Sequence, residues 1–188
     1  MNKWTGKHII ERNKPRWQLI AVLLLSSVVG SSAMAQCAAG NINTAVPASA
    51  PLSEFAEQDD GTLRHKRTGL IWQRCALGQN WDGNACTGIE TQLNWSSALS
   101  AADSHIQAEQ DDWRVPNRKE LASIIEQRCF SPALDNDAFP LAPVTIYWSS
   151  TPVSGGGEQV WSVDVMDGIV VPATTETLQA VRLVRGRF

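Results

Sequence analysis

The sequence signatures of common catalytic and metal-binding sites are missing from this chain. It contains no G-x-S-x-G motif and no C-x-x-C pair, and the glycines at 155–157 are more typical of a flexible connection than of a phosphate-binding loop. His65 and His105 lie at no ligand spacing from the cysteines and have no serine–acid context. No acidic pair has the spacing of a calcium loop. We therefore expect no catalytic residue, no metal ligand and no cofactor, and a protein that is not an enzyme.

Long apolar runs are also scarce. The run Leu19–Val29 has eleven residues, fewer than the about 20 that a membrane-spanning helix needs. Five basic residues precede it, and an Ala-x-Ala site that ends at Ala35 follows it. These features predict a signal peptide over residues 1–35, cleavage between Ala35 and Gln36, and export to the periplasm or the cell exterior. An uncleaved membrane anchor is the alternative, and lipidation of Cys37 is not expected, because Gln36 is not a small residue.

Basic residues are scarce after the predicted signal peptide. The signal contains five of the 16 basic residues and one of the 19 acidic residues, which leaves 11 and 18 and a formal net charge of −7. Nucleic acids and anionic membrane surfaces require clustered lysine or arginine, and this acidic composition does not favour them. The composition therefore argues against nucleic acid as a partner and against stable membrane insertion after cleavage.

The four cysteines all lie beyond the predicted signal peptide. An even number of cysteines in an exported chain indicates disulfides, each of which contributes about 2–4 kcal/mol. Cys75 and Cys86 enclose a short loop rich in glycine and asparagine, which a disulfide closes easily. This pairing leaves Cys37 to bond with Cys129. A metal site is the alternative, but the ligand spacing does not favour it.

Two helices are predicted in the middle of the chain. Asn94 is the expected N-cap of the first helix. Asn117 and Glu120 form a capping-box pattern that begins the second helix, which we expect to end at Cys129. The apolar stripe of the first helix consists of Trp95, Ala98, Leu99, Ala102 and Ile106.

Strands are predicted on both sides of these helices. Residues 62–65 and 70–74 form a hairpin, and residues 144–151, 158–166, 169–171 and 178–188 form later strands, with a turn at Asp167-Gly168. Residues 36–53, rich in alanine, proline and serine, are expected to form an extended arm before a domain over residues 54–188. The order of elements predicts an α+β fold in which both helices pack on one antiparallel sheet.

Six tryptophans follow the signal peptide, and their surroundings differ. Trp72, Trp95, Trp148 and Trp161 lie on apolar faces of predicted elements, so we expect them in the core. Trp81 lies next to Asp82 in the polar loop that Cys75 and Cys86 enclose. An exposed tryptophan can stack on the apolar face of a sugar ring, so Trp81 and Asp82 are the candidate ligand-binding residues.

The charged residues have simpler structural interpretations. The acidic pairs, including Asp59-Asp60, Asp135/Asp137 and Asp164/Asp167, are expected to serve turns and caps. The arginines Arg114, Arg182 and Arg185 each lie between apolar residues. We expect them to pair with carboxylates and fix helix–sheet packing, with ligand contact as the alternative.

Several segments together resemble the Lcl C-terminal domain family. They are DGTLRHKRTGLIWQRCALGQ at 60–79, W-x-x-A-L at 95–99, DWRVPNRKEL at 112–121, FP at 139–140, YWSST at 147–151 and VRLVRG at 181–186. The likeness covers roughly residues 52–188. It implies a C-type-lectin-like fold, with two helices flanking a twisted antiparallel sheet and long loops. It also implies extracellular binding in adhesion or biofilm, with sulfated glycans among the ligands.

This chain departs from that family pattern in ways that affect the ligand. It has no collagen-like stalk, the formal charge of −7 after the predicted signal peptide is wrong for a sulfated polyanion, and it lacks the EPN, QPD and WND motifs of calcium-dependent lectins. We expect a non-catalytic binding module for a surface glycan or protein. It would use the loop 75–86, with Trp81 and Asp82, and the connection 153–158. The alternatives are an enzyme similar to the formylglycine-generating oxidases and a structural subunit of an envelope assembly.

Overall fold

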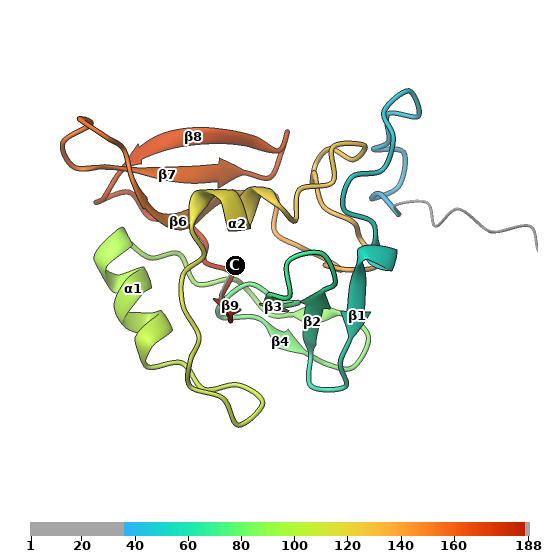
Figure 1. Cartoon of the computed structure of the whole chain (residues 1–188), viewed down its shortest axis with the longest axis horizontal. Coiled ribbons are helices and arrows are strands. Elements are labelled where there is room, and N and C mark those ends of the chain that lie inside the picture. Colours follow the sequence, from blue (N-terminus) through green and yellow to red (C-terminus); the bar gives the residue numbers. More distant parts are fainter. Residues whose placement is uncertain (1–35, 187–188) are drawn as a thin grey trace, which may run out of the picture. The chain divides into compact units, whose positions relative to one another are not determined.

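The computed structural model describes residues 36–186. The predicted signal peptide and Ala35 lie outside the described residues, as do residues 187 and 188. Figure 1 shows the order and arrangement of the elements. The helices are η1 (Leu52–Glu54, a 3-10 helix), α1 (Trp95–Asp103) and α2 (Arg118–Ala122). The strands are β1 (Phe55–Glu57), β2 (Thr62–His65), β3 (Ile71–Gln73), β4 (Asn80–Trp81), β5 (Cys86–Thr87), β6 (Ile146–Pro152), β7 (Gln159–Asp164), β8 (Ile169–Thr174) and β9 (Val184–Arg185).

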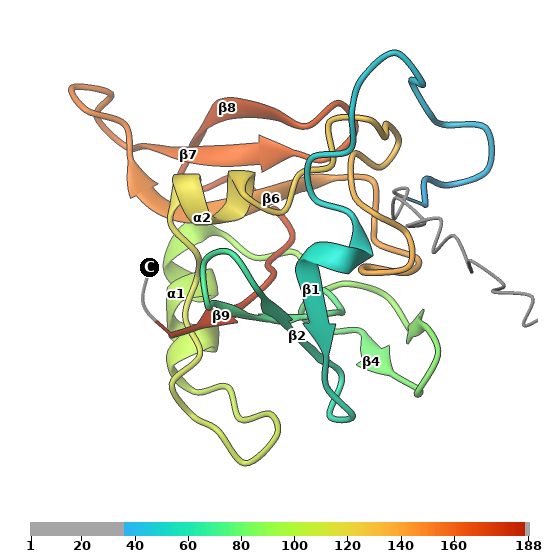
Figure 2. The same ribbon diagram turned by 45° about the vertical axis from the view of Figure 1, so that its right-hand side comes forward.

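The fold is α+β, as predicted, but the prediction of one sheet is wrong. The strands form three antiparallel sheets, ordered β1-β2-β3-β9, β4-β5 and β6-β7-β8. Helix α2 lies beside the β6-β7-β8 sheet, on the side that faces the four-stranded sheet (Figures 1 and 2). The hairpins β2-β3 and β7-β8 are confirmed, the second with its turn at Asp167-Gly168.

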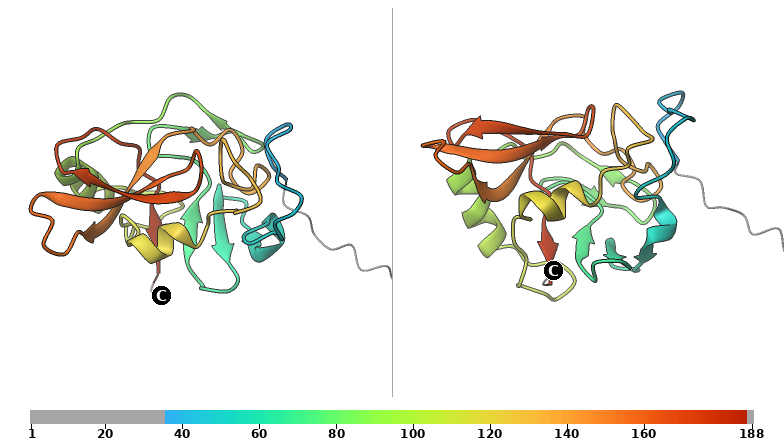
Figure 3. Two further views of the ribbon diagram at one scale, coloured as in Figure 1. Left: turned by 90° about the horizontal axis from the view of Figure 1, so that it is seen from above. Right: turned by 45° about the horizontal axis from the view of Figure 1, so that its top comes forward.

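The segment from Leu178 to Arg185 connects elements of different sheets. It was predicted as one strand over 178–188, yet only Val184 and Arg185 form a ladder, with β3. The residues before them bond in turn to different neighbours. Gln179 pairs with Leu93, Ala180 forms a parallel bridge with Tyr147, and Val184 also pairs with Arg114. The segment therefore runs between the sheets and links them (Figure 3).

Both predicted helices exist, and both are shorter than predicted. The Asn94 side chain caps α1 by accepting the N–H of Ser97 at 2.9 Å. Ile106 lies beyond the end of α1 and is 71% exposed, so its place in the apolar stripe was wrong. The capping box of α2 is confirmed, but α2 ends at Ala122 and not at Cys129. The buried Glu126 carboxylate instead accepts the N–H of Arg128 at 2.9 Å, a local bond that belongs to a turn.

The arm over residues 36–53 is bonded to the domain along its length. The predicted disulfide Cys37–Cys129 is present near its start. Glu126 accepts the N–H groups of Ser49 and Ala50 at 2.8–3.0 Å. Breaking these bonds would leave a buried carboxylate without partners, which costs free energy. The arm is therefore held as part of the fold.

Two apolar clusters form the core, and each contains one fully buried tryptophan. Trp72 lies in the cluster between the four-stranded sheet and α2, and Trp148 lies in the cluster beside α1. Trp95 packs against the second cluster while half-buried. The prediction of a core position for Trp161 is wrong, because its ring is half-buried and lies 5.1 Å from the Arg118 guanidinium.

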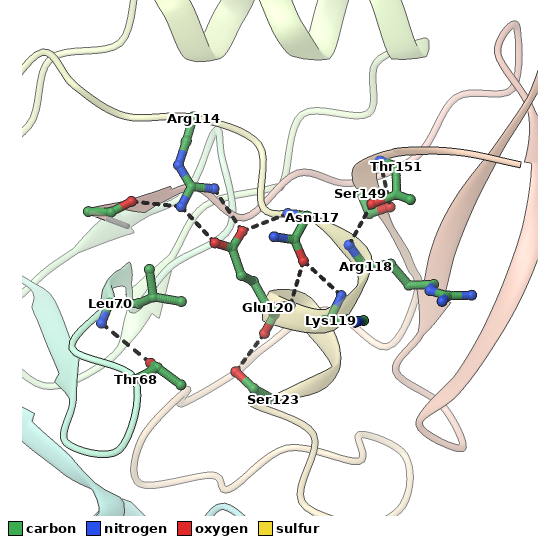
Figure 4. A network of polar contacts seen from close by, with 11 residues as sticks. Thr68, Leu70, Arg114, Asn117, Arg118, Lys119, Glu120, Ser123, Ser149 and Thr151 are labelled. Atoms are coloured by element: carbon green, nitrogen blue, oxygen red, sulfur yellow. Dashed lines mark hydrogen bonds and ion pairs between the residues drawn. The ribbon is translucent and has the colours of Figure 1, made fainter. Parts of the chain in front are cut away.

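The three arginines differ in their partners. Arg114 donates to both oxygens of the buried Glu120 at 2.7 and 2.8 Å, as predicted (Figure 4). Arg185 pairs with Asp112 at 2.7 Å. For Arg182 the prediction of a carboxylate partner is wrong. Its buried guanidinium donates to the carbonyl oxygens of Gln73 and Arg74, and burial lowers its pKa.

We expect Arg114→Met to destabilise the fold by about 2–3 kcal/mol, because it leaves a buried carboxylate without its cation. The matched change Arg185→Met removes an arginine whose partner Asp112 is half exposed, and should cost less than about 1 kcal/mol. Urea denaturation measures both. Equal losses for the two variants would contradict this assignment.

Stability should also depend on His65. Its ring is fully buried and stacks on Phe55 at 4.8 Å, and burial lowers its pKa, with a smaller contribution from Arg67. The unfolded chain takes up a proton below about pH 6.5 and the folded chain does not, so stability falls as the pH falls below that value. His65→Gln should flatten this acid dependence of the urea midpoint. An unchanged slope would show that His65 is not its source.

Candidate functional site

The candidate site is built on the loop that the Cys75–Cys86 disulfide closes. That disulfide is present as predicted, and the short strands β4 and β5 pair inside the loop, with Trp81 opposite Cys86. Twelve residues thereby form a closed hairpin with little freedom to unfold locally. The hairpin carries Trp81 at a fixed position beside the four-stranded sheet.

The Trp81 ring is half-buried and is held by two neighbours. A Cβ atom added to Gly61 would lie 2.9 Å from the Cβ, Cγ and Cδ1 atoms of Trp81, so the indole packs directly on the Gly61 backbone. The Arg74 guanidinium lies 4.3 Å from the ring centroid, within cation–π range. The ring is therefore set in place before any ligand arrives.

Arg74 is a structural residue and not a free cation. It is buried, and its three nitrogens donate to the Glu57 carboxylate at 2.8 Å and to the backbone oxygens of Asp137 and Ala138. Because these bonds engage all three nitrogens and one of them is an ion pair with Glu57, Arg74 supports Trp81 and its charge is balanced by a carboxylate.

Trp81 borders two open clefts. The first has a volume of about 530 Å³ and the second about 430 Å³. Each has an exposed aliphatic side chain at its edge, Leu141 at 65% and Ile106 at 71%. The polar lining of the first cleft comes from Glu57, Arg74, Asn84, Asn136 and Asp137. That of the second comes from Asp59, Asp60, Gln73, Gln79, Asn80, His105 and Gln107.

Side-chain hydrogen bonds fix one wall of the second cleft. The Gln73 amide nitrogen lies 2.6 Å from Nε2 of His105 and donates to the Gln107 side-chain oxygen at 2.7 Å. Gln107 in turn donates to the Asp60 carbonyl at 3.3 Å. This wall presents amide and imidazole groups, which suit a ligand with several hydroxyl or amine groups.

Of the two predicted ligand residues, Trp81 faces both clefts and Asp82 lines neither. The Asp82 carboxylate accepts the N–H groups of Ala85 and Asn84 at 2.8 and 2.9 Å, and these bonds lower its pKa. In the structure Asp82 shapes the turn between β4 and β5. The connection 153–158 contributes to neither cleft, and it lies at the far end of β6 and β7 from β4 (Figures 1 and 2).

Sequence reasoning missed most residues around Trp81. Glu57 belongs to β1, Gln107 follows α1, and Asn136 and Asp137 lie in an irregular segment rich in proline. No periodic pattern links these positions. The one available signal was the cysteine pairing, which identifies the loop but not the segments that surround it.

Residues 36–186 contain neither a metal-binding cluster nor a membrane-spanning helix. That part of the chain holds no group of three or more histidine, cysteine, aspartate or glutamate side chains placed to bind a metal ion. Nor does any helix in the same range have the length and apolar character to cross a bilayer.

The contact between Gly61 and Trp81 can be tested with a matched pair of glycines. Gly61 and Gly69 have nearly equal positive φ angles, +77° and +75°, so Ala strains both backbones by about 1 kcal/mol. Only at Gly61 does the new Cβ meet Trp81, because nothing lies within 4 Å of it at Gly69. We expect Gly61→Ala to cost at least about 1 kcal/mol more than Gly69→Ala in urea denaturation. Equal costs would mean that the indole can move aside freely.

Comparison with known proteins supports the family assignment. The model of the Lcl C-terminal domain matches residues 61–185, which is more than half of the chain. A search of the curated proteins found no significant match. The matched range contains Trp81, which lines both clefts, together with Arg74, Arg114 and Glu120. This chain belongs to the Lcl C-terminal domain family.

Proposed function

We propose that this protein is an exported, non-catalytic binding module that recognises a carbohydrate chain at the two clefts around Trp81. One observation carries the proposal: a half-buried indole, positioned by Gly61 and Arg74, borders two adjacent polar clefts. A ligand long enough to cross Trp81 would contact both clefts, whereas a single small molecule would use one.

The chemistry of the clefts suits a polyhydroxyl ligand. The apolar C–H face of a sugar ring stacks on an indole, and its hydroxyl groups bond to planar amides and carboxylates. Asn84 and Asn136 supply amides in the first cleft, and Gln107 supplies one in the second. A ring that is already fixed loses little conformational freedom on binding, which favours affinity.

The charges of the clefts favour a neutral or amine-bearing glycan over a sulfated one. Among the described residues, the one lysine or arginine in the lining of the first cleft is Arg74, which is buried and paired with the Glu57 carboxylate. The second cleft has no lysine or arginine and carries Asp59 and Asp60 at its edge. A sulfate group would therefore meet more carboxylates than cations, whereas an amine would be attracted. This preference is opposite to the one that the family resemblance implies.

The disulfides are consistent with an exported role. Two disulfides indicate an oxidising compartment, in agreement with the predicted signal peptide. All four cysteines are paired, and an enzyme similar to the formylglycine-generating oxidases would need reactive thiols. A binding module of this kind would act in adhesion to a glycan-bearing surface or in contacts within the cell envelope.

Trp81→Ala should weaken glycan binding by about 30-fold or more, because it removes the surface shared by both clefts. The exported protein is screened on an array of neutral, amine-bearing and sulfated oligosaccharides, and positive ligands are measured by calorimetry. Trp161→Ala is the matched control, since Trp161 is also half-buried beside an arginine but lies on β7. The proposal fails if the well-folded protein binds no glycan, or if both variants lose binding equally.

The charge preference has its own pair of variants. Asp59→Asn should weaken binding of an amine-bearing oligosaccharide several-fold and reduce its salt dependence. Glu158→Gln removes the same charge from the connection 153–158 and should have no effect. Preferential binding of sulfated oligosaccharides would contradict the proposed charge preference, but it would agree with a glycan site around Trp81.

A further inference from the structure

Asp135 is a fully buried carboxylate whose bonding partners are all backbone N–H groups. One oxygen accepts from Asp137 at 2.9 Å and from Ala138 at 3.0 Å. The other accepts from Leu52 at 3.0 Å and from Gln36 at 3.1 Å. No lysine or arginine side chain in residues 36–186 pairs with it, and burial raises its pKa against the effect of these four bonds. A buried carboxylate without a cation is a costly arrangement that a nearby positive charge would relieve.

Gln36, the residue that bonds to Asp135, is held on both sides. Its carbonyl oxygen accepts the N–H of Asn136 at 2.6 Å, and the next residue, Cys37, is joined to Cys129 by a disulfide. The Gln36 residue itself is exposed while its nitrogen reaches the buried carboxylate. This nitrogen therefore has a fixed position that does not depend on its charge.

Gln36 is also the residue with which the exported chain is predicted to begin. Hydrolysis of the Ala35–Gln36 peptide bond adds one water molecule, which leaves a carboxylate on Ala35 and a protonated amine on Gln36. We propose that Asp135 is the receptor for the α-ammonium group that signal-peptide removal creates at Gln36. The single amide N–H of the precursor becomes a group with three N–H donors and a full positive charge, 3.1 Å from the Asp135 oxygen.

This ion pair would connect processing to the candidate site. Asn136 and Asp137, which follow Asp135 directly in the chain, line the first cleft beside Trp81. The pair would strengthen the bond that already attaches the start of the arm to this wall of the cleft. The proposal rests on the predicted cleavage site and does not depend on which ligand the clefts bind.

The other charged residues of the surrounding segments do not replace the ammonium group. They are Glu54 of η1, Asp137 of the Asp135 loop, Glu126 in the segment after α2, and Arg74, which donates to the carbonyl oxygens of Asp137 and Ala138. None of them is hydrogen-bonded to the Asp135 side chain through its own side chain. Glu126 holds Ser49 and Ala50 in the same way, and therefore provides a matched buried carboxylate that does not touch Gln36.

The test uses protein exported with its own leader, and mass spectrometry of the intact protein establishes its first residue. The ion pair should raise the pKa of the Gln36 amine above the ordinary 7.7–8.0, so that acylation of the amine at pH 8 is about tenfold slower than in the unfolded chain. Stability from the pair is fully present below about pH 7.7 and is lost as the pH rises through the raised pKa. The urea midpoint should therefore fall between about pH 8 and pH 10.

Three variants decide the result. A glycine inserted between Ala35 and Gln36 moves the ammonium group by about 3.5 Å and should abolish both the slow acylation and the alkaline loss of stability. Asp135→Asn should do the same, and should also let the N-terminal glutamine cyclise faster with loss of ammonia. Glu126→Gln should lower stability without changing the alkaline slope. The proposal is wrong if the insertion leaves the slope unchanged, if the chain begins at another residue, or if native Gln36 is already cyclised.

Discussion

The ion pair between Arg114 and Glu120 is the interaction on which the arrangement of this domain most depends. Glu120 belongs to a helix of five residues, too short to be stable by itself. Its carboxylate receives both Arg114 bonds and the Asn117 N–H, while Arg114 also donates to the Gly186 carbonyl. The start of α2, the segment before it and the chain end beside β9 are thus joined at one buried charge (Figure 4).

Buried carboxylates also hold the N-terminal arm over residues 36–53. Glu126 and Asp135 are buried carboxylates that accept backbone N–H groups from residues 36–52. A domain with short strands leaves many backbone donors unpaired, and buried carboxylates satisfy several of them at once. Residues 36–52 can therefore be part of the fold without forming regular secondary structure. For the same reason, a new N-terminus at Gln36 would lie beside the Asp135 carboxylate.

The candidate binding surface depends on this framework rather than on any motif. The disulfide-closed hairpin carries Trp81, the Gly61 turn supports the indole, and Arg74 links it to Glu57 and to the 137–138 backbone. These contacts hold the indole in place, and the charged residues that line the two clefts are, apart from Arg74, aspartate and glutamate. The proposed preference for a neutral or amine-bearing glycan over a sulfated one rests on this excess of carboxylates beside the indole.

The sequence alone determined the elements whose signals are local: the two helix caps, the hairpins β2-β3 and β7-β8 with the turn at Asp167-Gly168, and both disulfides. Caps and hairpins depend on residues a few positions apart, and the disulfides follow from the number and spacing of the cysteines. The amino-acid sequence is therefore enough to predict them. Only the tertiary structure decided the division into three sheets, the burial of Arg182 without a carboxylate, and the meeting of Glu57, Gln107 and Asn136 around Trp81. These depend on which distant segments satisfy each other's backbone groups, and periodicity carries no information about that choice.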